Sequence, residues 1–270
     1  NIMNKELIVR SSSDIVDFAL LKDGKLIELH KDEEDNNFEV GDIFIAKIRK
    51  VVSGLNAAFV NVGYEKDGFL HYHDLGPQLP SLLKFIKRVS TGKLRDYTLK
   101  NFPMEKDLDK HGSIANAIKS NQSILVQVVK EPISTKGPRI SSELSIAGRY
   151  IVLVPFSNRI SISQKIESQE EKDRLKRLVK SITPKGFGVI IRTVAEGKKV
   201  AELDSDLQNL LDRWTAMCKK LYKAHHPTKV LGEMNKASSI LRDIFNDSFS
   251  AIVVDDEELY IQVKDYVQQI

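Results

Sequence analysis

The chain has 270 residues, of which 41% are hydrophobic, a net charge of +4 and one cysteine. This hydrophobic content can fill ordinary cores and argues against wholesale disorder, and no apolar run is long enough to predict a membrane span. The single Cys218 excludes an internal disulfide framework and a zinc site built from several cysteines. Its helical spacing to Trp214 favours packing in a core over reactivity. A cytoplasmic protein is the simplest expectation.

The first 37 residues predict strands. Residues 7–9 form a short apolar run, and residues 15–21 and 25–29 flank Asp23-Gly24, a dipeptide that supplies the positive φ of a tight hairpin turn. The acidic stretch 31–37 is expected to form a linker.

A second β-rich segment begins at Gly41. Strands are expected around residues 43–48, 57–62, 69–71 and 124–129, with glycine-containing turns between them. A small barrel interrupted by an insertion explains this pattern.

The insertion, residues 76–120, concentrates positive charge. It holds nine Lys and Arg against four Asp and Glu, a balance of +5, whereas the rest of the chain sums to −1. Localised positive charge suggests a polyanionic partner. Hydrophobic residues recur there at helical spacing: Leu82, Leu83, Ile86 and Val89. The sequence leaves open whether this amphipathic helix presents a basic face to RNA or is a solvated helix that caps the barrel. Residues 112–120 are expected to be flexible.

The remaining residues predict a mixture of strands and helices. Strands are expected at these positions: 140–146, 150–155, 160–166, 187–193 and 251–254. Helices are expected from Ser168 and at residues 207–221, 240–245 and 257–269. Ser168 and Glu171 have the spacing of a capping box, in which each residue caps the backbone of the other.

Several ordered segments together resemble the N-terminal half of the RNase E/G family of endoribonucleases. The matching segments are GDIF (41–44), GLNAAFVNVG (54–63), DGFL (67–70), SIAGRYIVL (145–153), ISQKIE (162–167) and GVIIRT (188–193). Ordered matches over most of the chain are far more specific than any one of them.

The resemblance implies a mixed α+β fold with an RNase H-like domain split between residues 1–38 and 222–270. Between the two parts it implies an OB-fold RNA-binding domain of the S-one type at residues 39–132, which carries the basic insertion 76–120. A 5′-sensor region at residues 133–221 would follow. The family's DNase I-like domain, in which two aspartates hold Mg²⁺, would come after Ile270. We therefore expect no catalytic residue and no bound metal in this chain.

The resemblance also implies RNA-binding residues. Phe59 and Phe69 would stack on bases of single-stranded RNA, Lys130 would contact phosphate or base, and Lys165 would be a weaker RNA contact. By sequence alone, Phe59 lies among apolar residues and burial in a core is favoured; the family resemblance reverses that preference. The neighbouring Gln164 departs from the consecutive basic residues that relatives carry here.

A second implied site binds a 5′-terminal phosphate. Arg192 and Thr193 resemble the family's phosphate-binding pair. Both side chains suit this role, because a guanidinium and a hydroxyl donate hydrogen bonds to phosphate oxygens. Successive strand residues face opposite ways, so both can reach one phosphate only if the strand turns there. Gly148 and Val152 would shape the pocket by close backbone approach and by a hydrophobic wall. Ala195 replaces a glycine of some relatives.

No set of residues in the sequence predicts catalysis. Residues 255–258 are all acidic and could bind Mg²⁺, but carboxylates before a helix more often cap its N-terminus. His71 and His73 alternate and share a strand face, without a third metal ligand at recognisable spacing.

Three functions remain open at this point. The leading one is the RNA-binding and 5′-monophosphate-sensing part of a Mg²⁺-dependent, single-strand-specific endoribonuclease in RNA decay or rRNA processing. Its partner would be single-stranded RNA, and the complete protein would be a homo-oligomer. The second is a non-catalytic RNA-binding adaptor. The least favoured is an independent RNase H-like nuclease built around Asp255 and Asp256.

Overall fold

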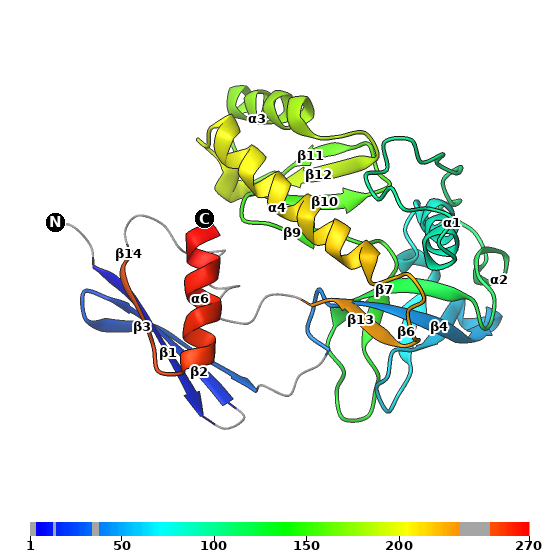
Figure 1. The fold of residues 1–270 in the computed structure, drawn as a ribbon, viewed down its shortest axis with the longest axis horizontal. Coiled ribbons are helices and arrows are strands. Elements are labelled where there is room, and N and C mark those ends of the chain that lie inside the picture. Colours follow the sequence, from blue (N-terminus) through cyan, green and yellow to red (C-terminus); the bar gives the residue numbers. More distant parts are fainter. Residues whose placement is uncertain (1–3, 13–14, 34–37, 233–248, 270) are drawn as a thin grey trace. The chain divides into compact units, whose positions relative to one another are not determined.

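The computed structural model describes residues 4–12, 15–33, 38–232 and 249–269. The chain divides into two compact units, one made of residues 1–37 and 233–270 and the other of residues 38–232. Both contain helices and strands (Figure 1), which confirms the mixed α+β class. The helix expected at residues 240–245 lies outside the described residues. Within the described ranges, no helix is long and apolar enough to cross a membrane.

The first unit is a four-stranded sheet with one helix. The sheet order is β14-β1-β2-β3, and the elements are β1 (Lys5–Ser12), β2 (Ile15–Lys22), β3 (Lys25–Glu33), β14 (Phe249–Val254) and α6 (Glu257–Gln269). Asp23 and Gly24 have φ angles of 50° and 77°, which confirms the predicted hairpin turn. The strand β3 continues into the segment expected to be a linker. The RNase H-like assignment of this unit stays a prediction.

Asp256 confirms the structural role favoured for the acidic cluster. Its Oδ1 accepts the N–H of Leu259 at 2.9 Å, so it caps the N-terminus of α6. The helix buries Val263 against Leu7 and Phe18 of the sheet. The cap therefore starts the helix that supplies this core.

The second unit contains a closed five-stranded barrel. Its strands are β4 (Ile43–Val52), β5 (Ala57–Asn61), β6 (Gly68–His71), β7 (Ser123–Lys130) and β8 (Arg139–Ser141). They follow the order β4-β5-β6-β8-β7, and β7 pairs with β4 to close the barrel. This confirms the predicted barrel and is consistent with an OB fold. An additional strand, β13 (Thr228–Leu231), pairs with β4, so this unit extends to Gly232, whereas the sequence-based division placed residues 222–270 together.

A second sheet follows the barrel along the chain. Its order is β11-β12-β10-β9, and its strands are β9 (Ile146–Ala147), β10 (Ile151–Pro155), β11 (Ile160–Ile162) and β12 (Phe187–Ile191). The helices α3 (Gln169–Ile182) and α4 (Val200–Lys219) pack against its strands. On the other face, Val152 and Val154 are half-buried and Ile190 is exposed.

Two expected strands are shorter than predicted. The expected strand 140–146 is two strands, because the chain leaves the barrel after β8 and joins the second sheet at β9. The expected strand 160–166 ends at Ile162, where the hydroxyl of Ser163 accepts the N–H of Lys165 and turns the chain. Ser168 caps α3 as predicted, but the carboxylate of Glu171 is paired with Arg174.

The basic insertion contributes to the core. Its helix α1 (Leu79–Ser90) buries Phe85 and Val89 in the same hydrophobic cluster as Trp214 of α4. The rings of Phe85 and Trp214 lie 5.5 Å apart. Cys218 is buried in this cluster, which confirms its predicted packing role, and burial raises the pKa of its thiol.

Residues 112–120, which were expected to be flexible, include a short helix and buried side chains. The short helix α2 (Ile114–Ala117) buries Ile114, and the neighbouring Ile118 is also buried. The side chain of Asn56 fixes this segment, because it donates to the carbonyl of Gly112 and accepts the N–H of Ile114.

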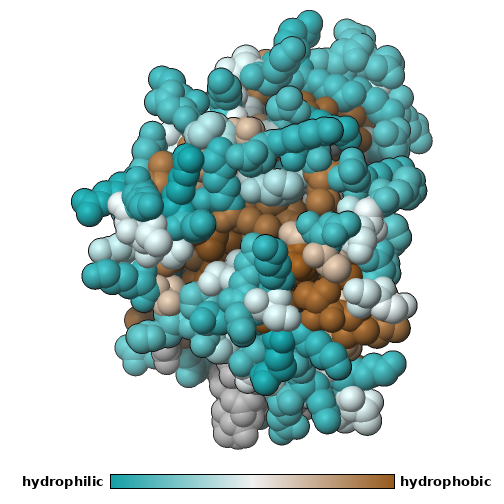
Figure 2. Space-filling model, turned by 90° about the vertical axis from the view of Figure 1, so that its right-hand side faces the viewer, coloured by the Kyte–Doolittle hydropathy of each residue, from teal (hydrophilic) through white to brown (hydrophobic). Residues whose placement is uncertain are grey.

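Hydrophobic residues also reach the surface: on the face drawn in Figure 2 they gather in the middle, with hydrophilic side chains around them.

Candidate nucleic-acid interface

Five side chains form a row across the five strands of the barrel. The strand register pairs neighbouring members in the order Lys50, Phe59, Phe69, Arg139 and Lys130. Directly paired residues of neighbouring strands have their side chains on the same face of a sheet. All five are exposed or half-buried. We call these five residues the barrel row; it places two aromatic rings between basic side chains.

The two phenylalanines of the barrel row lie side by side. Their ring centroids are 5.8 Å apart at an interplanar angle of 63°. Their chain neighbours, such as Val60 and Leu70, point inward and are fully buried. Phe59 therefore does not belong to the buried core, although the sequence alone favoured its burial. Half-buried aromatic rings on a barrel surface can stack on nucleic-acid bases.

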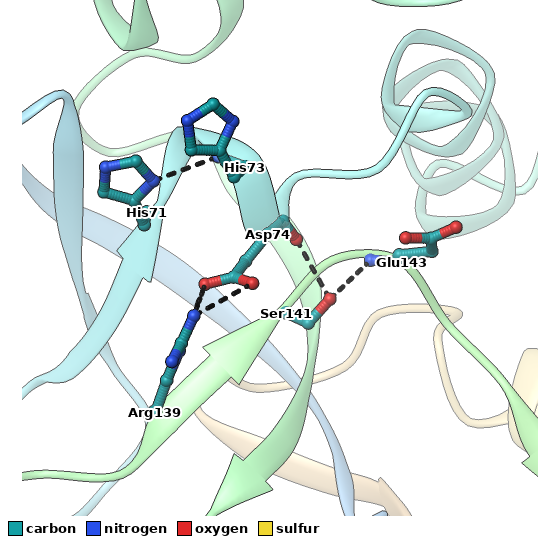
Figure 3. Close-up of polar contacts among 6 residues, drawn as sticks. All are labelled: His71, His73, Asp74, Arg139, Ser141 and Glu143. Atoms are coloured by element: carbon teal, nitrogen blue, oxygen red, sulfur yellow. Dashed lines mark hydrogen bonds and ion pairs between the residues drawn. The ribbon is translucent and has the colours of Figure 1, made fainter. Parts of the chain in front are cut away.

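Two histidines continue the line of rings beyond Phe69. The ring of His71 lies 6.4 Å from that of Phe69, and the ring of His73 lies 4.9 Å from that of His71. The Nδ1 of His71 accepts the backbone N–H of His73 at 3.1 Å (Figure 3). In the sequence, the spacing of these two histidines pointed only to possible metal ligands. The period of two that links residues 69 and 71 was the signal for a shared face with the phenylalanines.

Arg139 of the barrel row is held by Asp74. Its Nη2 lies 3.1 Å from Oδ2 of Asp74, and the hydroxyl of Ser141 donates to the Asp74 carbonyl at 2.9 Å (Figure 3). The Arg139 side chain is still 55% exposed. An exposed ion pair of this kind contributes about 0–1 kcal/mol to stability. Asp74 therefore orients the guanidinium of Arg139 and leaves it exposed.

The predicted phosphate-binding pair lies where the second sheet ends. The strand β12 stops at Ile191, and the 3-10 helix η3 (Thr193–Ala195) begins immediately after Arg192. The turn that the two side chains require is therefore present. Nη1 of Arg192 donates to the carbonyls of Gly148 and Arg149 at 2.9 and 3.0 Å, which fixes the position of the guanidinium.

The hydroxyl of Thr193 is part of a small polar contact. Its Oγ1 lies 2.7 Å from Oγ of Ser163, and the same Ser163 oxygen accepts the N–H of Lys165 at 3.3 Å. A shallow depression at this position is lined by Ser163, Ile190, Ile191, Arg192, Thr193 and Val194. Val152 pairs with Ile190 in the strand register and supplies hydrophobic surface beside the depression. Lys165 lies in the turn that follows β11 and is exposed.

Gly148 is required by a contact within the protein. A Cβ at this position would lie 2.6 Å from Oδ2 of Asp206 on α4. The Asp206 carboxylate accepts the N–H groups of Arg149, Tyr150 and Ile151 at 3.0, 2.9 and 3.1 Å. Because these N–H groups donate to Asp206, they do not point toward the depression at Arg192. An anion bound in that depression would be contacted by side chains. Asp206 was not predicted, because a half-buried aspartate within a helix gives no sequence signal.

Known proteins are similar to this chain along almost its whole length. The Ribonuclease E/G family matches residues 145–270. The chain is 30% identical over 267 residues to Ribonuclease G of Escherichia coli, covering 99% of this chain and 51% of that protein. It is 31% identical over 267 residues to Ribonuclease E of Nostoc sp., covering 98% of this chain and 34% of that protein.

A third relative is the Ribonuclease E/G-like protein of Pyropia yezoensis, 34% identical over 220 residues, which are 81% of this chain and 38% of that protein. The chain thus spans about half or less of the length of these relatives. The matches include both the barrel and the segment that carries Arg192 and Thr193. From its sequence and its barrel, the chain belongs to the ribonuclease E/G family.

Proposed function

We propose that the chain is the RNA-binding and 5′-monophosphate-sensing part of a Mg²⁺-dependent, single-strand-specific endoribonuclease that acts in RNA decay or rRNA processing. The barrel row carries this proposal, because it combines two stacking surfaces with three cations on one face. Family membership supports nuclease activity of the complete protein.

The barrel row suits single-stranded RNA of any sequence. Bases stack on Phe59 and Phe69, since every base offers a π-face, and each stack contributes about 1–3 kcal/mol. Lys50, Arg139 and Lys130 then lie on the two sides of the rings, where they attract the phosphates. Duplex RNA has its bases already stacked, so the row favours single strands.

Arg192 and Thr193 bind the 5′-terminal phosphate in this proposal. Two backbone carbonyls orient the guanidinium, so less conformational freedom is lost when it binds an anion. Its planar fork matches two phosphate oxygens, and the Thr193 hydroxyl adds a donor. A terminal monophosphate carries more negative charge than an internal phosphodiester, which gives the site its preference for the end of the strand.

In this proposal the Mg²⁺ of the complete enzyme is held outside the described residues. Within the described ranges there is no group of three or more His, Cys, Asp or Glu side chains that could hold a metal ion. Within the acidic cluster, Asp256 caps α6. The steps assigned to this chain are therefore binding steps of its own side chains.

The test is equilibrium binding of a 3′-labelled single-stranded RNA that carries either a 5′-monophosphate or a 5′-hydroxyl. We expect tighter binding of the monophosphate and loss of this preference in Arg192→Lys, which keeps the charge but not the planar fork. Phe59→Ala and Phe69→Ala should each weaken both RNAs equally, by about 5–150-fold. Thermal unfolding checks that each variant folds.

Two outcomes would contradict separate parts of the proposal. Equal affinity of the unmodified protein for both RNA ends would remove 5′ sensing. Unchanged affinity in both phenylalanine variants would remove the barrel row as the RNA-binding surface. A nuclease assay of the complete protein, with these variants introduced, then shows whether binding limits cleavage.

A further inference from the structure

The basic insertion contains a hollow on the outer side of α1. It is lined by Pro80, Lys84, Lys87, Arg88, Thr91, Lys93 and Glu105. We call it the basic hollow. Its lining includes four cations and one carboxylate, a balance of +3 on a small area. Such a density of one sign attracts a polyanion.

Only one of these cations is paired with the carboxylate. Lys84 lies 2.8 Å from Glu105 and also donates to the carbonyl of Pro103. The hydrogen bond from Lys84, together with the positive charges of Lys84 and Arg88, lowers the pKa of Glu105. Among the described residues, the structure shows no ion pair for Lys87, Arg88 or Lys93.

The cations of the basic hollow stand on a rigid support. On the inner side of α1, Phe85, Ile86 and Val89 are buried in the main core of the unit. The helix ends at Ser90, and Gly92, with φ 76°, turns the chain so that the N–H of Lys93 donates to the carbonyl of Arg88 at 2.9 Å. This turn fixes the backbone of Lys93 beside the last turn of the helix.

The basic hollow is connected with the candidate phosphate site. Glu105 also lines a neighbouring groove, whose lining includes Val154 and Ile190 on the open face of the second sheet. Ile190 in turn lines the depression at Arg192 and Thr193. Three hollows of the same unit thus adjoin through shared residues. The groove between the two cationic sites is lined by hydrophobic residues together with charged side chains of both signs, among them Asp107, Glu143 and Arg159.

We propose that the basic hollow binds phosphodiester groups of single-stranded RNA. The connection with the groove favours RNA over an acidic protein segment, because the groove adjoins the depression at Arg192 and Thr193, the pair assigned above to an RNA phosphate. This inference rests on RNA being the ligand of the chain, as proposed above, but it does not require 5′ sensing. Arg88 offers a planar fork to phosphate oxygens, and Lys87 and Lys93 offer point charges.

The test uses a double variant and a control of equal charge. Lys87→Gln with Arg88→Gln removes two cations of the basic hollow. Lys176→Gln with Arg177→Gln removes the same pair of residue types from consecutive positions on α3, where both side chains are exposed and line none of the three hollows. Binding of a 16-nucleotide, 5′-hydroxyl RNA is measured over a range of salt concentrations.

We expect the hollow variant to bind RNA more weakly than the control at low salt. The slope of log affinity against log salt should become shallower by about 1.4, since each lost contact to a single strand contributes about 0.7. The control variant should keep the slope of the unmodified protein. Equal slopes and affinities of the two double variants would overturn the proposal.

Two further measurements separate the inference from its alternatives. If the end preference is absent while the hollow variant still binds weakly, 5′ sensing fails and the basic hollow stands. If a poly-glutamate peptide binds the unmodified protein but not the hollow variant, while RNA affinity is the same in both, the hollow belongs to a protein partner and the inference is wrong. Thermal unfolding confirms that both double variants fold, as expected for replacements of side chains outside the core.

Discussion

Replacing Gly148 by alanine is expected to destabilise the unit of residues 38–232 through Asp206. The new Cβ would lie 2.6 and 2.7 Å from the two carboxylate oxygens, closer than folded proteins tolerate, so the carboxylate must move. Three backbone N–H groups, those of Arg149, Tyr150 and Ile151, donate to it. Movement of Asp206 therefore weakens several hydrogen bonds at once.

The magnitude follows from these contacts. Hydrogen bonds to a charged group contribute about 1.5–3 kcal/mol each, but three that share one half-buried carboxylate are not additive, so Asp206→Ala should cost about 2–4 kcal/mol. Gly148→Ala should cost about 1–3 kcal/mol, the usual range for an overpacked site. Once the carboxylate is absent the overlap disappears. Gly148→Ala should then cost less than about 0.5 kcal/mol in the Asp206→Ala background.

Urea unfolding followed by tryptophan fluorescence measures these costs, because the only tryptophan, Trp214, is buried in the core of the same unit. Gly54→Ala is the matched control, since nothing lies within 4 Å of a Cβ there, and it should cost little. Additive costs of the two substitutions in the double variant would refute the overlap between Gly148 and Asp206.

Three further predictions concern other parts of the chain. Cys218 should stay unmodified by a thiol reagent at pH 8 in the folded protein and react after denaturation, because burial raises its pKa. Asp256→Ala should lower the stability of the first unit by about 0.5–2 kcal/mol, measured by urea unfolding and circular dichroism, as the N-cap bond to Leu259 is lost. Burial, with the charge of Lys47, lowers the pKa of His226, so the folded state favours the neutral imidazole. Its share of stability should be complete above the unfolded-state pKa of about 6.5 and decline as the pH falls below it; a melting temperature with the same pH dependence in His226→Gln would contradict this.

Local sequence patterns predicted most elements of the fold. Asp23-Gly24 identified the hairpin, and the spacing of hydrophobic residues identified α1 and α4, because each pattern depends on residues close in the sequence. The divided strand at residues 140–146 was not predictable in the same way. Its two halves belong to different sheets, so its break depends on partners that lie far away along the chain.

The candidate site was predictable only where a motif carried it. Phe59, Phe69 and Arg192 stand in segments that resemble the family. Lys50 joins the barrel row only because β4 pairs with β5, and Arg139 only because β6 pairs with β8. Asp206 meets Arg149 across 57 positions of sequence. The roles of Lys50, Arg139 and Asp206 depend on contacts between residues far apart in the sequence. No local pattern in a single sequence predicts such contacts.

The insertion explains how the two candidate RNA sites can act on one strand. A longer loop between β6 and β7 costs little chain entropy, about 0.6 kcal/mol for each doubling of its length. In return, Phe85 and Phe102 of the insertion pack against Phe156, which directly follows β10, with ring centroids 5.3 and 5.8 Å from it. Ile43, Ile45 and Leu125 of the barrel strands belong to the same hydrophobic cluster as these rings, whereas the interior of the barrel forms a cluster of its own. This packing fixes the distance between the barrel row and Arg192. An RNA strand bound at one site is then at a high effective concentration for the other site. The affinity of each site can therefore be modest while the combined binding is tight.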